Sequence, residues 1–481
     1  MADKAKSKPT ANKSRRKSSA TSASNTPNPA SAANLATSPA TSAAPEPRVL
    51  QQPVFSQPEP TADPTVFRVR HPSDNDVYKE IDKLNAEHKL FPLPFPAPRG
   101  GTEPRLTLAE VLGGNKDAVK QIEKRGQMVF HSTGDCGSIK GPATQNEVAD
   151  KMTADFVEAD VKEVPQFMLM LGDVVYDFGE GKYYYDQFYE PHRDYPAPIL
   201  ACAGNHDGMV SPEAHATSLA AYLRNFCAEG FVVTPEAGGL SRTAQIQPGV
   251  FFTFEAPFVR VLVLYSNTLE DPGVIADSTH IGESQLAFLE AALKRVKAEK
   301  YQGALLIADH HPPYTVSRHG WSVELLAQID SICEKTGVWP HAFLSGHAHN
   351  YQRFTRTRSA DSTQIPYVVC GNGGHGLAKL TKHGEPALRV PQVIQKAGKN
   401  TDEVVLENYD DVNFGYLRII VNDAQLRIEY HSASDGVNAK APNDYVTIDL
   451  HSRMIGHFSA TDLGRPKAAA ELRAMLKKQK A

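Results

Sequence analysis

The middle of this 481-residue chain carries five short polar motifs, and these constrain its fold and its chemistry most. Four of the five end or interrupt an apolar run that is typical of a β-strand. Each motif offers oxygen or nitrogen donors suited to a hard or borderline metal ion. One motif alone would predict little, whereas five in succession predict a shared site. In chain order they are GDCG at 134–137, GDVVY at 172–176, GNHD at 204–207, HHP at 310–312 and GHAH at 346–349.

The composition excludes several classes of protein. Lys and Arg number 51 and Asp and Glu number 55, which gives a formal net charge of −4. This near balance argues against a strongly anionic partner, so we expect no nucleic acid to bind. No run approaches the roughly 18 apolar residues of a membrane-spanning helix, so we expect no membrane association. The five cysteines are odd in number and irregularly spaced, which favours buried thiols over a disulfide framework.

The composition also divides the chain into four parts. Residues 1–62 are rich in Ser, Ala, Thr, Pro and Lys and almost lack large apolar residues, so we expect a disordered tail. A mixed N-terminal arm follows over 63–124, and the motif-bearing domain occupies 125–455. Residues 456–481 form a basic C-terminal tail. The pair Arg15-Arg16 resembles part of a twin-arginine export signal, but no apolar segment follows it. The location is therefore uncertain, with the cytoplasm as the default expectation.

Strand, loop and helix patterns repeat through the motif-bearing domain. Apolar runs at 128–133, 166–171 and 198–203 predict buried strands, and 144–163 predicts an amphipathic helix. This repeat predicts an α/β domain whose polar loops follow the carboxyl ends of strands. Residues 208–249 interrupt the repeat and are expected to face the substrate. Further predicted elements are helices at 182–189, 283–300 and 323–334, and strands at 250–254, 259–265, 304–308, 341–344, 367–370, 415–421, 425–430 and 445–450.

The motif side chains form a donor set suited to two metal ions. Two ions held about 4 Å apart clamp a phosphate and generate hydroxide from water near neutral pH. Such a centre needs a bridging carboxylate together with hard oxygen donors and imidazoles from several loops. A lone Gly-Asp pair predicts only a turn, and a lone His-x-His pair fits a surface loop. The whole set after successive strands favours ligation by Asp135, Asp173, Asn205, His310, His347 and His349.

The five motifs resemble those of the purple acid phosphatases, a group within the calcineurin-like metallophosphoesterases. That family has the patterns GDxG, GDxxY, GNH(D/E), VxxH and GHxH, and this sequence departs from them only at Ile307, which replaces Val. The resemblance covers roughly residues 125–450. It implies a four-layer αββα sandwich with two mixed sheets, in which the metals lie at the carboxyl-terminal edge of the strands.

The resemblance also implies how the ligands are shared between two ions. One ion would be held by Asp135, Asp173, Tyr176 and His349, and the other by Asp173, Asn205, His310 and His347. Asp173 is then the bridge. Tyr176 alone would suggest an aromatic side chain packed near a strand end, but its offset of three from Asp173 favours a phenolate ligand that stabilises Fe(III). The second ion would be Fe(II), Zn(II) or Mn(II), because imidazole and amide donors do not choose among them.

Four further residues are expected to contact the substrate or to orient a residue that does. In the family, the histidine equivalent to His206 faces the substrate and assists the leaving group. Asp207 would orient that imidazole through a carboxylate–imidazole pair. Arg318 and His319 lie in a loop where family members often place a phosphate-contacting histidine, so they are candidates to hold the non-bridging phosphate oxygens. The glycine-rich run 371–376 is expected to serve backbone geometry.

These features together predict a binuclear metal-dependent acid phosphatase that cleaves small-molecule phosphomonoesters through a metal-bound hydroxide. A phosphodiesterase of the same superfamily is an alternative, because the motifs set the metal site while the loops set the substrate. An alternative of another class is a metal-binding scaffold without turnover. The natural substrate and the oligomeric state do not follow from the sequence.

Overall fold

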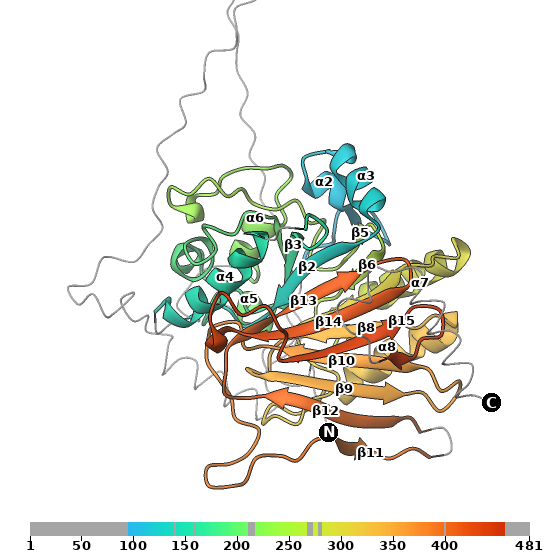
Figure 1. Ribbon diagram of the computed structural model, residues 1–481. Coiled ribbons are helices and arrows are strands. Elements are labelled where there is room, and N and C mark those ends of the chain that lie inside the picture. Colours follow the sequence, from blue (N-terminus) through green and yellow to red (C-terminus); the bar gives the residue numbers. More distant parts are fainter. Residues whose placement is uncertain are drawn as a thin grey trace, which may run out of the picture. The chain divides into compact units, whose positions relative to one another are not determined.

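The computed structural model describes residues 95–138, 141–157, 160–209, 217–266, 273–277, 281–398 and 401–456, and the fold below refers to these (Figure 1). The tail expected over 1–62 lies outside the described residues, as does all but the first residue of the C-terminal tail expected over 456–481. The arm expected over 63–124 is described from residue 95 onward.

The first of two sheets contains nine strands and is mixed. Its centre is parallel, since β6, β7, β8 and β10 run in the same direction, and antiparallel strands complete both sides. In spatial order the strands are β1 (Arg105–Thr107), β5 (Phe252–Ala256), β6 (Val259–Val263), β7 (Ala304–Ala308), β8 (Ala342–Ser345), β10 (Gln364–Cys370), β9 (Tyr351–Thr357), β12 (Glu403–Asp410) and β11 (Gln392–Gln395). Strand β1 comes from the expected N-terminal arm, so part of that arm belongs to the sheet.

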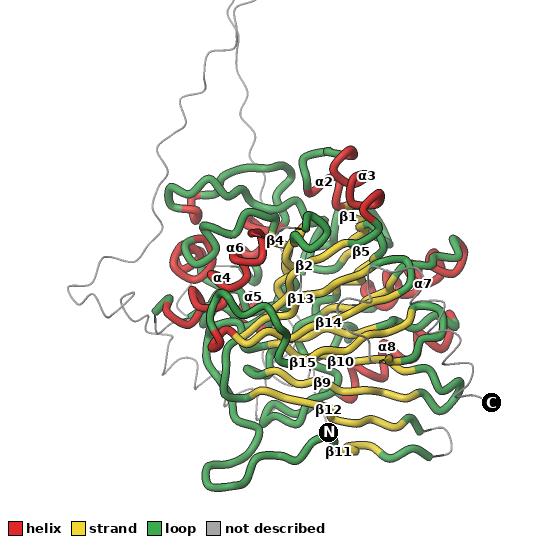
Figure 2. The backbone as a smooth tube through the Cα atoms, viewed as in Figure 1, coloured by secondary structure: helices red, strands yellow, loops and turns green. Residues whose placement is uncertain are grey.

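The second sheet contains seven strands and is also mixed. Its parallel part is formed by β2, β3 and β4, and β13 joins it in antiparallel register. Figure 2 shows β13, β14 and β15 running side by side. In spatial order the strands are β16 (Ile455–Gly456), β15 (Asp444–Asp449), β14 (Gln425–Ser432), β13 (Gly415–Val421), β2 (Met128–Thr133), β3 (Pro165–Met170) and β4 (Ile199–Ala201).

The two sheets pack face to face, because alternate residues of each strand enter one shared core. On β7, Leu306 points into the core between the sheets, whereas Leu305 and Ile307 join the apolar cluster that includes helices α7 (Ser284–Ala298) and α8 (Val323–Thr336). On β3, Leu169 faces the inter-sheet core and Met168 faces the cluster that includes α4 (Ala143–Ala154). This period of two gives four layers, helix, sheet, sheet and helix.

The remaining helices are short. They are α2 (Leu108–Val111), α3 (Lys116–Arg125), α5 (Asn205–Gly208) and α6 (Ala220–Phe226). No helix within the described residues is long and apolar enough to span a membrane. The predicted fold class, an α/β sandwich with two mixed sheets, is confirmed.

Several element boundaries differ from those predicted. The helix predicted at 144–163 ends at Ala154 and gives way to a 3-10 turn, Asp155–Val157. The helix predicted at 182–189 is a 3-10 turn followed by a π-helical turn, Tyr185–Tyr189. Strands β9 and β12 were not predicted, since Gln, Arg and Thr in β9 and Glu, Asn and Asp in β12 weaken the apolar alternation. Each is held by neighbours on both sides, so tertiary pairing overrides a weak local pattern.

The inter-sheet core predicts a clear effect on stability. Phe167 of β3 is fully buried, stacks on Phe130 of β2 with ring centroids 4.5 Å apart, and meets Phe254 of β5 edge-on at 4.9 Å. Phe167→Ala should lower the free energy of unfolding by about 3–5 kcal/mol, because it leaves a cavity between the sheets. Urea unfolding of the metal-free protein measures this loss. The control Val412→Ala, at a side chain that is 55% exposed, should change stability by less than about 0.5 kcal/mol. A loss at Phe167 as small as that control would contradict the packing.

Candidate metal centre

The polar motifs follow strands whose carboxyl ends meet at one edge of the two sheets. In the second sheet, Asp135 follows β2, Asp173 follows β3 and Asn205 follows β4, and these three strands are parallel neighbours. In the first sheet, His310 follows β7 and His347 follows β8, which are also parallel neighbours. Parallel strands end on the same side, and face-to-face packing brings the two groups of loops together.

One set of donors surrounds the hydroxyl of Tyr176. That oxygen lies 3.0 Å from Oδ1 of Asp135, 2.9 Å from Oδ2 of Asp173 and 3.2 Å from Nε2 of His349. Nε2 of His349 lies 3.4 Å from Oδ1 of Asp135. The four side chains come from three different loops, and Asp135 and Asp173 are fully buried.

A second set of donors surrounds Nε2 of His310. That nitrogen lies 3.2 Å from Oδ2 of Asp173, 2.9 Å from Oδ1 of Asn205 and 3.2 Å from Nδ1 of His347. All four residues are buried. Candidate ligand atoms of Asp173, His310 and His347 all lie within 4.8 Å of one another.

The spacing within each set fits coordination of a metal ion. Ligands held about 2.1 Å from one ion lie roughly 3.0 Å apart in octahedral geometry and roughly 3.4 Å apart in tetrahedral geometry. Donor separations of 2.9–3.4 Å occur in both sets. Oδ2 of Asp173 is the one atom common to both sets, so a single carboxylate oxygen lies between the two positions.

The backbone at these loops is adapted to crowding around the carboxylates. Asp135, Asp173 and His347 have φ values of 56°, 50° and 65°, in the left-handed region that few non-glycine residues adopt. Gly204 passes so close to Asp173 that a Cβ atom built there would lie 2.1 Å from Oδ1 of Asp173. A glycine is therefore required at Gly204 by this contact, and the strained φ values cluster where the donors converge.

Charges inside the site already compensate one another without a metal. Burial lowers the pKa of His310, but the neighbouring Asp173 carboxylate outweighs burial and raises the pKa to about 10. Burial, together with the charges of Asp135 and Asp173, raises the pKa of Tyr176 well above its ordinary value. The imidazole of His310 is thus protonated and the phenol of Tyr176 neutral at pH 7. A metal ion that binds here displaces both protons.

His206 faces the same centre, and its partner differs from the one predicted. Nδ1 of His206 lies 2.6 Å from the carbonyl oxygen of Asp177, and Nε2 lies 3.9 Å from Oδ2 of Asp173. Because a carbonyl only accepts, Nδ1 carries the hydrogen and Nε2 is directed toward the donor sets. The Asp207 carboxylate instead accepts the N–H groups of Gly204 at 2.8 Å and Val174 at 3.2 Å. The predicted carboxylate–imidazole pair is therefore replaced by a backbone carbonyl, and Asp207 ties together two of the ligand-bearing loops.

The loop residues Arg318 and His319 lie on the open side of the centre. The His319 ring has its centroid 4.6 Å from that of His347 and 6.1 Å from that of His349. Arg318 is exposed and lines a cavity of about 420 Å³ together with His349 and Lys379. His319 thus reaches the donor sets, whereas Arg318 lies at the rim.

Comparison with known proteins identifies the kind of centre. The calcineurin-like phosphoesterase family matches residues 130–351, which span all five motifs. The chain is 23% identical over 315 residues to "Probable inactive purple acid phosphatase 9" of Arabidopsis thaliana, covering 58% of this chain and 43% of that protein. It is 31% identical over 93 residues to "Tartrate-resistant acid phosphatase type 5" of Oryctolagus cuniculus, covering 19% of this chain and 25% of that protein.

The chain resembles the purple acid phosphatases within the calcineurin-like metallophosphoesterases. It spans less than half the length of the two curated relatives it matches. Among solved structures, it is similar to "GAP50 the anchor in the inner membrane complex of Plasmodium", with a TM-score of 0.42 and 12% identity, over 66% of this chain and 88% of that one.

Two residues of this candidate centre were not predicted from the sequence. The His375 ring stacks on Tyr176 with centroids 3.5 Å apart and an interplanar angle of 19°. Gln187 clamps the Tyr176 backbone, since its side-chain amide accepts from the N–H at 2.8 Å and donates to the C=O at 2.9 Å. His375 lies in the glycine-rich run 371–376, whose glycines were expected to serve backbone geometry. No motif marks Gln187, so only the folded contacts identify it.

The contacts of Asp207 predict a specific defect. Asp207→Asn places an amide N–H₂ group against backbone donors, so the loops of Gly204 and Val174 should separate and metal affinity should fall by about 10- to 100-fold. The metal content of protein dialysed against a defined free-metal buffer measures this. The matched control His206→Gln should keep its metals, because His206 belongs to neither donor set. A residue that acts only through His206 would affect turnover but not metal content. If Asp207→Asn kept its metals and lost only turnover, the proposed role of Asp207 in joining the two loops would be wrong.

Proposed function

We propose that this protein is a binuclear metal-dependent acid phosphatase that hydrolyses phosphomonoesters. One observation carries the proposal: Oδ2 of Asp173 belongs both to the donor set around Tyr176 and to the donor set around His310. In this proposal two ions would share Asp173 as a ligand. One would also be held by Asp135, Tyr176 and His349, and the other by Asn205, His310 and His347.

The identities of the ions follow from the donors. A phenolate from Tyr176 with two carboxylates makes a hard, anionic set that suits Fe(III). The other set has a neutral amide and two imidazoles besides the shared carboxylate, which suits Fe(II), Zn(II) or Mn(II). When bound, the pair of ions supplies Lewis acidity toward the phosphoester and a nucleophile derived from water near neutral pH.

The protein's own side chains then handle protons and charge. Nε2 of His206 is directed toward the centre. In the imidazolium form, which acid pH favours, both ring nitrogens carry hydrogen, and we assign the Nε2–H group to protonating the leaving alkoxide. The carbonyl of Asp177 fixes the ring orientation, so no reorientation is needed during the reaction. His319, whose ring meets that of His347, is assigned to the equatorial phosphate oxygens, with Arg318 at the rim in support.

The open side of the centre favours a monoester with an exposed, charged terminal phosphate. Its cavity is lined by the cationic side chains of Arg318 and Lys379 next to His349. A monoester carries close to two negative charges at neutral pH and a diester only one, so cations at the rim favour the monoester. A diesterase of the same superfamily remains the alternative, and it would need room on both sides of the phosphate.

The alternative from another functional class is a metal-binding scaffold without catalytic turnover. The word "inactive" in the name of the Arabidopsis relative makes this alternative relevant to this chain. Against it, this chain retains all seven proposed ligands and brings their donor atoms within coordination distance of one another. A protein that only bound metals would not need His206 aimed at the centre.

The bridging assignment predicts the metal content of three variants. Asp173→Asn should lose both ions, whereas Asp135→Asn should lose mainly the ion on the Tyr176 side, because only Asp173 serves both. Tyr176→Phe should lose the visible phenolate-to-Fe(III) band of the purified protein. Elemental analysis and the visible spectrum measure these effects. An iron-loaded Tyr176→Phe protein of unchanged colour would refute the phenolate ligand, and retention of one full ion in Asp173→Asn would refute the bridge.

The substrate class is tested with a pair of chromogenic esters. Turnover of p-nitrophenyl phosphate should exceed that of bis(p-nitrophenyl) phosphate at acid pH, and His206→Ala should lower the monoesterase rate constant by about 10²- to 10⁴-fold with both metals retained. Faster diester turnover would move the function to a phosphodiesterase. Two bound metals with neither activity would support the scaffold.

A further inference from the structure

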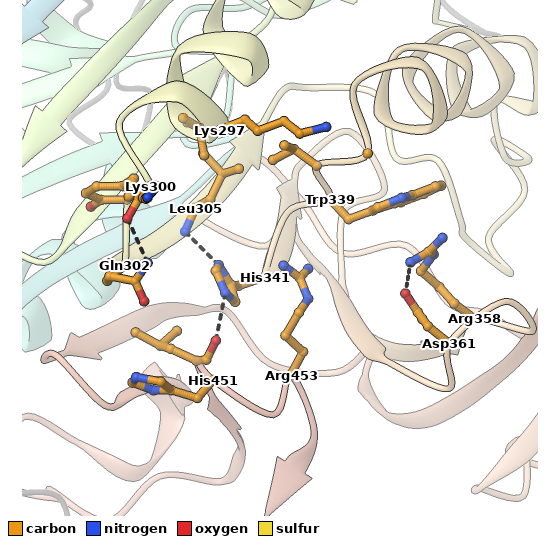
Figure 3. A pocket seen from close by; sticks show the side chains of 16 residues that line it. Lys297, Lys300, Gln302, Leu305, Trp339, His341, Arg358, Asp361, His451 and Arg453 are labelled. Atoms are coloured by element: carbon orange, nitrogen blue, oxygen red, sulfur yellow. Dashed lines mark hydrogen bonds and ion pairs between the residues drawn. The ribbon is translucent and has the colours of Figure 1, made fainter.

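A second pocket lies far from the metal centre, at the amino ends of β7 and β8. Figure 3 shows it, with side chains from α7, from β7, from the segment before β8, and from the segment after β15. Its volume is about 390 Å³. Leu305 at its wall is five residues before the proposed ligand His310, which corresponds to roughly 16 Å along an extended chain. The pocket is therefore separate from the catalytic cavity.

The pocket walls carry an excess of positive charge. Lys297, Lys300, Arg358 and Arg453 line it, and Asp361 is the one acidic residue among the lining side chains. His341 also lines the pocket, but burial and the Arg453 charge lower its pKa to about 3, so it is neutral. The permanent charges therefore sum to about three positive units, on side chains from α7 and from two later segments.

Protein groups compensate this charge only in part. Asp361 is bound by Arg358, and Lys297 donates to the carbonyl of Thr336 at 2.7 Å. Arg453 donates to the carbonyl of Pro340. Within the part of the chain that the structure describes, neither Arg453 nor Lys300 is paired with a carboxylate. Burial and the charge of Arg358 lower the pKa of Arg453 to about 10, and the nearby charge of Asp361 offsets this only in part.

Trp339 gives the pocket a rigid floor. Its ring is 8% exposed, and the guanidinium of Arg358 lies 3.9 Å from the ring centroid, where a cation–π contact holds it. In Figure 3, Arg453 extends from its own segment between His341 and Arg358. Arg358 and Arg453 both line the cavity, and a guanidinium carries several N–H donors in a planar arrangement suited to phosphate oxygens.

We propose that this pocket binds a small anion carrying two or more phosphate groups, held by Arg358, Arg453 and Lys300. A charge of about three matches such an anion better than a single phosphate, and the cavity is large enough for two linked phosphoryl groups. The site does not depend on the phosphatase proposed above, because it shares no residue with the metal centre.

The chain offers a built-in reporter for this binding. It contains two tryptophans, Trp321 and Trp339, so Trp321→Phe leaves Trp339 as the sole indole. In that background, methylenebisphosphonate, whose P–C–P bridge cannot be hydrolysed, should cause a saturable change in Trp339 fluorescence at constant ionic strength. Adding Arg453→Gln should weaken binding about tenfold or more, since it removes a charge-assisted hydrogen bond. Lys300→Gln, at an exposed position that does not endanger folding, should weaken it about threefold.

The control is Lys294→Gln, which removes a lysine of the same helix outside the pocket and should leave binding unchanged. Inorganic phosphate in a parallel titration should bind at least tenfold more weakly than the bisphosphonate. Equal affinity for the two would overturn the requirement for two phosphoryl groups. The absence of a saturable change, or equal binding by the Arg453→Gln, Lys300→Gln and control proteins, would overturn the site.

Discussion

The buried carboxylate of Asp173 is the constraint around which the catalytic edge of this protein is organised. An anion that is fully buried is costly unless cations or N–H donors surround it, and Asp173 has both. Protonated His310 lies 3.2 Å away, and the backbone N–H of His206 donates to Oδ1 at 2.9 Å. Although burial opposes ionisation, these neighbours lower the pKa of Asp173. Replacing protons with metal ions therefore exchanges one set of cations for another around an anion that is already in place.

The double sheet explains how segments far apart in sequence meet there. Residues 134–207 belong to the second sheet and residues 310–349 to the first, and neither group contains a complete donor set. Face-to-face packing over a core of alternate strand residues fixes their separation. The sheets and the helix layer on each outer face form the core, and the strand-end loops carry the polar groups. Folds of this kind generally place functional residues on such loops. Loop changes can then alter the substrate without disturbing the sheets.

The sequence is most informative where chemistry depends on residues close together in the chain. The Gly-Asp pairs after apolar runs and the His-x-His pair could be predicted from the sequence. A tight turn next to a ligand residue produces a short, recognisable sequence pattern. The contacts of Asp207, His375 and Gln187 could not, because each joins loops that meet only in the folded protein. The end of α4 at Ala154 was also missed, since the residues that follow continue an acceptable helical pattern although they form a 3-10 turn in the structure.

The ring of Tyr176 shows what such folded contacts achieve. It lies between the imidazoles of His206 and His375, with centroids 4.2 Å and 3.5 Å away, and two hydrogen bonds with Gln187 fix its backbone. A tyrosine usually loses rotational freedom when it ligates a metal, and that entropy weakens binding. Here the loss has already occurred during folding, so an arriving ion meets an oxygen that is held in position. Packing interactions of the surrounding core, and not metal binding, therefore offset the rotational entropy that Tyr176 loses.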